Sequence, residues 1–63
     1  MLSLNQIQLI KNCFNVRSDI QEKFNNKTIN EHDVKEYMRI ANILESFKES
    51  EIFEAIEIIK GGF

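Results

Sequence analysis

Residues 25–34 have the sequence NNKTINEHDV, and this stretch predicts how the rest of the chain is arranged. Asn25 and Asn26 are favourable at a helix end, because asparagine tolerates the left-handed backbone conformation found there. Further on, Asn30 is a preferred N-cap residue, and Asp33 brings negative charge into the first helical turn, where the helix dipole favours it. The stretch therefore predicts the end of one helix, a short turn and the start of a second helix.

The segment before this turn is predicted to form one long helix over about residues 4–24. Ser3 and Gln6 have the spacing of a capping box, in which each side chain satisfies a free backbone N–H of the other residue. On a helical wheel, one half is apolar and carries Ile7, Leu9, Ile10, Cys13, Phe14, Val16, Ile20 and Phe24. Ser18 and Gln21 form a second possible capping box, so a break halfway along this helix stays open.

The segment after the turn is predicted to contain a second helix over about residues 31–47 and a third over about residues 51–60. Polar residues interrupt the apolar pattern between them, and Ser50 is a suitable N-cap for the third helix. Gly61 and Gly62 mark its end, since glycine is the usual helix terminator. An alternative is that the second helix continues to these glycines. The chain would then be a two-helix hairpin, of the kind that pairs into four-helix bundles.

Residues 1–63 are thus predicted to form a single all-α domain of two to three helices, an antiparallel helical hairpin plus a short C-terminal helix. A domain of this length buries only about 60% of the surface that its unfolded chain exposes, so its stability is marginal. Cys13 is the only cysteine and the chain has one histidine, which excludes an intramolecular disulfide and a four-ligand zinc site. We therefore expect dimerisation to complete the core.

The second and third helices carry more apolar surface than so small a core can cover. The second has one wide apolar face, and the third is apolar nearly all round, with only Glu54 and Glu57 on its polar side. We expect the apolar side chains left outside the core to contact a protein partner or a second copy of the chain, with aromatic groups as anchors. The predicted interface residues are Tyr37, Leu44, Phe47, Phe53 and Ile58.

No set of residues in the sequence is suited to catalysis, to a cofactor or to a metal. His32 and Glu36 have an i, i+4 spacing that can hold a metal, but two ligands are too few. Cys13 lies in the middle of the apolar half of the first helix, where we expect a buried and unreactive thiol. We therefore expect a protein that is not an enzyme and that carries no cofactor or metal.

The expected function is protein–protein interaction, as a regulator, an inhibitor, or a small co-chaperone or adaptor. The alternative is a DNA-binding regulator in which residues 20–40 form a helix-turn-helix. Its recognition helix would begin Asn30-Glu31-His32-Asp33 and would place carboxylates against phosphates. The net charge of −2 also argues against a nucleic-acid partner.

The composition indicates a cellular setting as well. A lone cysteine suits a reducing cytoplasm, and the N-terminus lacks the basic region and apolar run of a signal peptide. No apolar stretch approaches the length of a membrane span, so we expect no membrane association. Richness in Ile, Asn and Lys is typical of AT-rich genes, which indicates a bacterial or mobile-element origin.

Overall fold

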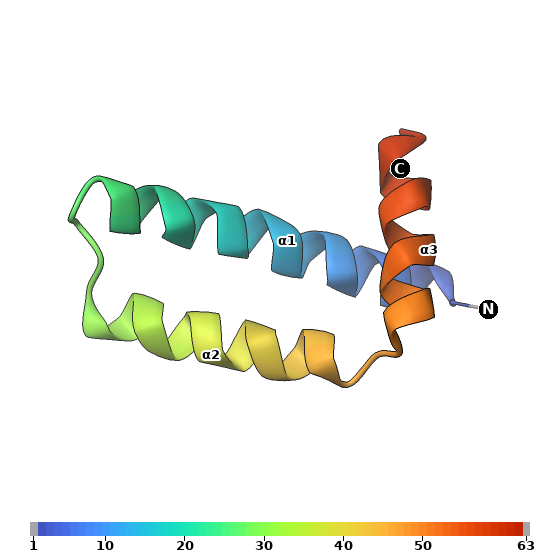
Figure 1. The fold of residues 1–63 in the computed structure, drawn as a ribbon, viewed down its shortest axis with the longest axis horizontal. Helices are drawn as coiled ribbons and strands as arrows, with labels where there is room; N and C mark the ends of the chain where they lie inside the picture. Colours follow the sequence, from blue (N-terminus) through green and yellow to red (C-terminus); the bar gives the residue numbers. More distant parts are fainter. Residues whose placement is uncertain (1, 63) are drawn as a thin grey trace.

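The computed structural model describes residues 2–62, and all the regular secondary structure in that part of the chain is helical. The helices are α1 (Leu4–Asn25), α2 (Glu31–Glu45) and α3 (Glu49–Lys60). Figure 1 shows α1 and α2 side by side as an antiparallel hairpin, with α3 turned away from α2 and lying across the N-terminal end of α1. The predicted hairpin and short C-terminal helix are confirmed, whereas dimerisation stays a prediction.

The capping box predicted at the start of α1 is present. The Ser3 hydroxyl accepts a hydrogen bond from the backbone N–H of Gln6 at 3.1 Å, and the Gln6 side-chain oxygen accepts one from the backbone N–H of Ser3 at 2.8 Å. From there α1 continues for 22 residues without interruption. The break considered near Ser18 is therefore absent from α1, which is one helix.

The turn between α1 and α2 differs from the expectation in one detail. The residue in the left-handed region is Lys27, with a φ of 60°, and not Asn25 or Asn26. The backbone N–H of Thr28 donates back to the carbonyl of Lys23 at 2.9 Å, which satisfies one of the free carbonyl groups at the helix end. Hydrogen bonding within the turn therefore selects the left-handed residue, which is one position after Asn26.

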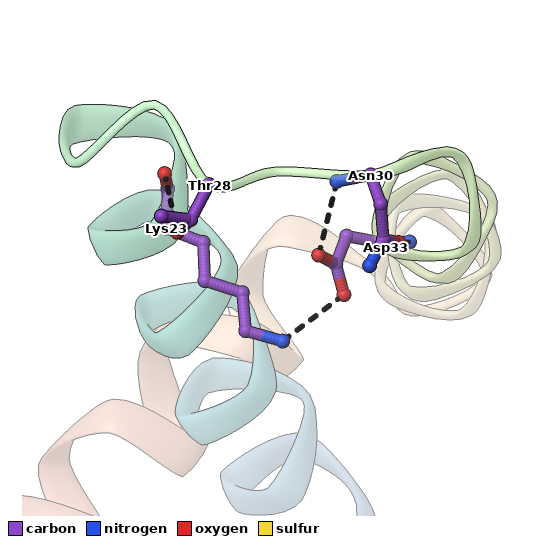
Figure 2. A network of polar contacts seen from close by, with 4 residues as sticks. All are labelled: Lys23, Thr28, Asn30 and Asp33. Carbon is purple, nitrogen blue, oxygen red and sulfur yellow. Dashed lines mark hydrogen bonds and ion pairs between the residues drawn. The ribbon is translucent and has the colours of Figure 1, made fainter.

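A small polar network joins the end of α1 to the start of α2 (Figure 2). The Asn30 side chain accepts from the backbone N–H of Asp33 at 2.9 Å, and Asp33 Oδ2 accepts from the backbone N–H of Asn30 at 3.3 Å. Asp33 Oδ1 also accepts from Lys23 Nζ on α1 at 3.2 Å. One carboxylate therefore both caps α2 and ties it to α1.

The Asp33 carboxylate is buried, with only 5% of the residue exposed. Burial raises its pKa, but the hydrogen bond from Lys23 and the backbone hydrogen bond from Asn30 lower the pKa further than burial raises it, and the net pKa lies below the ordinary value. The charged form is thus the one that the folded chain favours.

The joint between α2 and α3 corrects two sequence-based boundaries. The second helix ends at Glu45, so Phe47 lies in the connecting turn. The third helix begins at Glu49, and Ser50 lies inside its first turn and not at the N-cap. The Glu51 carboxylate accepts from the backbone N–H of Lys48 at 2.8 Å and supplies the cap from within the helix. Helices α2 and α3 are consequently separate, and the continuous-helix alternative is wrong.

The core is thin and has two parts that share α1. Leu44 packs against both parts, and Ile10 is the one large side chain in residues 2–62 that is fully buried. Ala55 is also fully buried, since its small side chain faces the core cluster beneath α3. The part under α3 contains Leu2, Ile7, Ile10, Phe14, Leu44, Phe47, Ile52, Ala55 and Ile59. The part between α1 and α2 contains Cys13, Val16, Ile20, Ile29, Ile40, Ile43 and Leu44.

The cap of α2 can be tested by substitution. Asn30→Ala removes the acceptor for the backbone N–H of Asp33 and is expected to lower the free energy of unfolding by about 1 kcal/mol. Asn42→Ala is the matched control, because Asn42 is exposed in the middle of α2, where alanine favours helix. Urea unfolding followed by circular dichroism measures both. Equal effects of the two substitutions would contradict the capping role.

The lowered pKa of Asp33 predicts how stability depends on pH. A carboxyl group with a lower pKa in the folded chain contributes stability above its unfolded pKa of about 4, and this contribution disappears as pH falls through the folded pKa. We expect wild type to be more stable than Asp33→Asn at neutral pH, and the difference to shrink as pH falls below about 4. Urea unfolding of both proteins across this range measures the difference, and a constant difference would contradict the assignment.

Candidate protein-interaction surface

A groove lies at the turn end of the hairpin, between the last turns of α1 and the first turns of α2. We call it the turn-end groove. It has a volume of about 230 Å³, and the polar Gln21 side chain lies at its edge. Its apolar lining consists of Ile20, Phe24, Ile29, Val34, Tyr37 and Met38. Phe24 and Met38 are each 62% exposed, so the two most exposed apolar side chains of the lining are mostly in water.

The groove is the part of one hairpin face that α3 does not reach. Phe24 stands fourteen residues after Ile10, close to four full turns, so both lie on the same face of α1. Ile10 is fully buried in the cluster that contains Ala55 of α3, whereas Phe24 has no such cover in residues 2–62. On α2, Tyr37 and Leu44 are seven residues apart and share a face in the same way. Leu44 packs in that cluster, and Tyr37 is exposed.

The groove continues toward α3 along the seam between α1 and α2. A smaller hollow of about 40 Å³ lies between Arg17, Tyr37, Ile40, Ala41 and Leu44. Tyr37 borders both the groove and this hollow, so the two are continuous, and Leu44 joins the hollow to the core under α3. Arg17 is the charged side chain in the lining of the hollow.

A second exposed apolar surface lies on the outside of α3, and we call it the α3 outer surface. It consists of Phe53, which is 60% exposed, and Ile58, which is 37% exposed. Ile52 and Ile59 point the other way and pack on the core with Ala55. Phe53 and Ile58 are five residues apart, about 140° around the helix, so they lie on the two flanks of this surface. The exposed Glu57 lies between them, so the surface is acidic as well as apolar. Glu54 is half-buried and accepts a hydrogen bond from the backbone N–H of Leu2 at 3.1 Å.

The five predicted interface residues are not brought together. Tyr37 borders the turn-end groove, and Phe53 and Ile58 form the α3 outer surface. Leu44 and Phe47 are half-buried against the core cluster under α3. They therefore stabilise the single chain, whatever further contact they make.

Sequence reasoning did not include Phe24, Val34 and Met38 among the interface residues. Phe24 belongs to the apolar half of the first helix. A helical wheel shows which side of a helix is apolar, but it does not show how far along the helix another helix covers that side. Ile29 and Val34, which precede and follow the Asn30 cap, have the spacing of a hydrophobic staple. That spacing is the signal that locates apolar side chains at this end of the hairpin.

The chemically reactive side chains are held in structural roles. Cys13 is 4% exposed, and burial raises the pKa of its thiol, which keeps it protonated and unreactive. The hydrogen bond from Arg39 lowers the pKa of Glu36, so this carboxylate is committed to an ion pair beside His32. Within residues 2–62 no group of three His, Cys, Asp or Glu side chains is placed to hold a metal ion. In the same part of the chain, every buried side-chain N or O atom has a hydrogen-bond partner.

The arrangement of the helices also bears on DNA binding. The helices of a helix-turn-helix cross at about 90–120°, whereas α1 and α2 lie side by side in an antiparallel hairpin (Figure 1). The sharper joint is the one between α2 and α3. The exposed side of α3 is acidic, however, with Glu49 and Glu57 against a single Lys60. Two further glutamates of α3, Glu51 and Glu54, are half-buried and accept hydrogen bonds from backbone N–H groups. Such a helix repels phosphate groups.

No helix within residues 2–62 combines the length and the apolar character that crossing a bilayer requires. Comparison with models of protein families, with curated proteins and with solved structures finds no match to this chain.

The difference between core and surface positions can be tested with two truncations. Ile10→Ala removes a fully buried side chain and is expected to lower the free energy of unfolding by about 2–5 kcal/mol. Phe53→Ala removes a larger side chain from an exposed position and is expected to change it by about 0.5 kcal/mol or less. Urea unfolding at one low protein concentration measures both, and a larger effect from Phe53→Ala would place Phe53 in the core.

Proposed function

We propose that the protein is a non-enzymatic helical interaction protein, which docks its exposed apolar helix surfaces on another protein or on a second copy of itself. One observation carries the proposal: residues 2–62 expose large apolar side chains at the turn-end groove, on the α3 outer surface, and at Leu4 and Leu9 in the N-terminal half of α1. Contiguous exposed apolar surface on a small domain is typical of protein contact sites.

The chemistry of the two surfaces favours a protein partner over other ligands. The turn-end groove, at about 230 Å³, is smaller than the roughly 300–1,000 Å³ of ordinary small-molecule sites. A larger hollow of about 510 Å³ is lined by residues of α1 alone. It is therefore a shallow depression between side chains of one helix, with no second element to enclose a ligand. Aromatic and aliphatic side chains on rigid helices match the anchors that dominate protein interfaces.

The role of such a protein is to occupy or join other proteins, as a regulator, an inhibitor, or a small co-chaperone or adaptor. A single buried thiol suits a reducing compartment, and we propose the cytoplasm as the place of action.

The α3 outer surface provides the test of partner binding. Capture from native cell extract with the wild-type chain is compared with capture by Phe53→Ser and by Glu57→Gln, an exposed polar position on the same helix. We expect a protein that wild type and Glu57→Gln retain and that Phe53→Ser loses at least tenfold, as for an interface anchor. Retention of DNA that weakens steeply with salt, in place of a protein, would contradict the proposal and support the helix-turn-helix alternative.

A further inference from the structure

We propose that the turn-end groove is the docking site for a second copy of this chain, which presents its own turn-end groove in a two-fold symmetric pair. The inference rests on the proposed function and specifies one of its surfaces and the occupant of that surface. The two hairpins together would form a four-helix arrangement, with each α3 at an outer end.

The accessible surface area supports an occupant of this size. The chain exposes 4862 Å², whereas the size scaling of monomeric proteins gives about 4200 Å² for a mass of 7.4 kDa. Each chain therefore exposes about 650 Å² more than a compact monomer of its mass. Burial of this excess on two copies gives an interface of about 1300 Å², inside the range of about 1,200–2,000 Å² found in stable complexes.

Half of the large exposed apolar side chains lie together at the groove. Within residues 2–62, eight large apolar side chains are exposed, and four of them line it, namely Phe24, Val34, Tyr37 and Met38. The others are divided between the N-terminal half of α1 and the α3 outer surface. The groove is thus the one place where burial removes a continuous apolar surface from water.

Charge determines which of the two surfaces can pair with the same surface of a second copy. The lining of the turn-end groove contains no charged side chain, and the nearby Lys23 is paired with Asp33. The lining residues of two copies therefore bring no like charges together, and the charged Arg17, which lines the adjoining hollow, is not part of this lining. The α3 outer surface would bring the exposed Glu49 and Glu57 carboxylates of the two copies close together, and like-charge contacts oppose association.

A second copy also meets the stability requirement of the chain. Ile10 is the one large side chain that is fully buried in residues 2–62, and the sequence offers no disulfide or zinc site to compensate. A second copy is present whenever the chain is made, so it can complete the core without depending on another protein. Closed two-fold pairs are also the commonest form of soluble homo-oligomer.

Sedimentation of two matched variants tests the inference. Met38→Glu places a charge in the groove, and Phe53→Glu places the same charge at a position of equal exposure on the α3 outer surface. We expect wild type and Phe53→Glu to form pairs in the micromolar range. We expect Met38→Glu to weaken pairing by more than about tenfold, because pairing would bury an unpaired carboxylate. Circular dichroism checks that each variant is folded, and Phe24→Glu, at another 62% exposed position, replaces Met38→Glu if that chain unfolds.

Other results overturn the inference in distinguishable ways. Pairing that survives Met38→Glu and is lost in Phe53→Glu would move the self-docking site to α3 and leave the proposed function standing. A wild-type chain that stays monomeric, with a melting temperature independent of concentration, would exclude the second copy as occupant. Protein capture that depends on Phe53 would still support the proposed function in that case. Failure of both experiments would remove the proposed function as well.

Discussion

The place where α3 crosses α1 constrains everything else in this structure. Helix α1 has 22 residues and is about 33 Å long, whereas α3 has 12 residues and spans about 18 Å. Because α3 crosses the N-terminal end of α1, it covers Ile10 and leaves the face beyond it open. The core is covered by α3 at one end of the hairpin and not at the other, and the open apolar groove is the direct result of that crossing.

The polar network of the turn holds the open end in place. Lys23, Asn30 and Asp33 fix the end of α1 relative to the start of α2 beside the turn-end groove. A charged and fully hydrogen-bonded carboxylate supplies directional bonds there. The groove is therefore bounded by two helices whose ends are tied together, and its shape is set before any partner arrives.

Local signals in the sequence were sufficient for most of the fold. The pairs Ser3 with Gln6 and Asn30 with Asp33 satisfy backbone groups within one turn, so spacing alone predicts them. The predicted start of α3 was two residues too late, because Ser50 is a typical N-cap residue. In the structure the helix begins at Glu49, and the Glu51 carboxylate satisfies the backbone N–H of Lys48. The prediction also named the wrong left-handed residue of the turn. The hydrogen bond from the backbone N–H of Thr28 to the carbonyl of Lys23 selects Lys27 for this conformation.

The candidate surfaces were harder to predict, because exposure depends on where a third helix ends in space. Tyr37 and Leu44 share one helical face, yet α3 covers Leu44 and leaves Tyr37 exposed. Once that coverage is known, the charges separate the two exposed surfaces. The uncharged turn-end groove can pair with the same groove of a second copy without repulsion between charges. The acidic α3 outer surface is better matched to a different protein that carries basic groups. The two surfaces lie at opposite ends of the hairpin, so occupation of one leaves the other accessible.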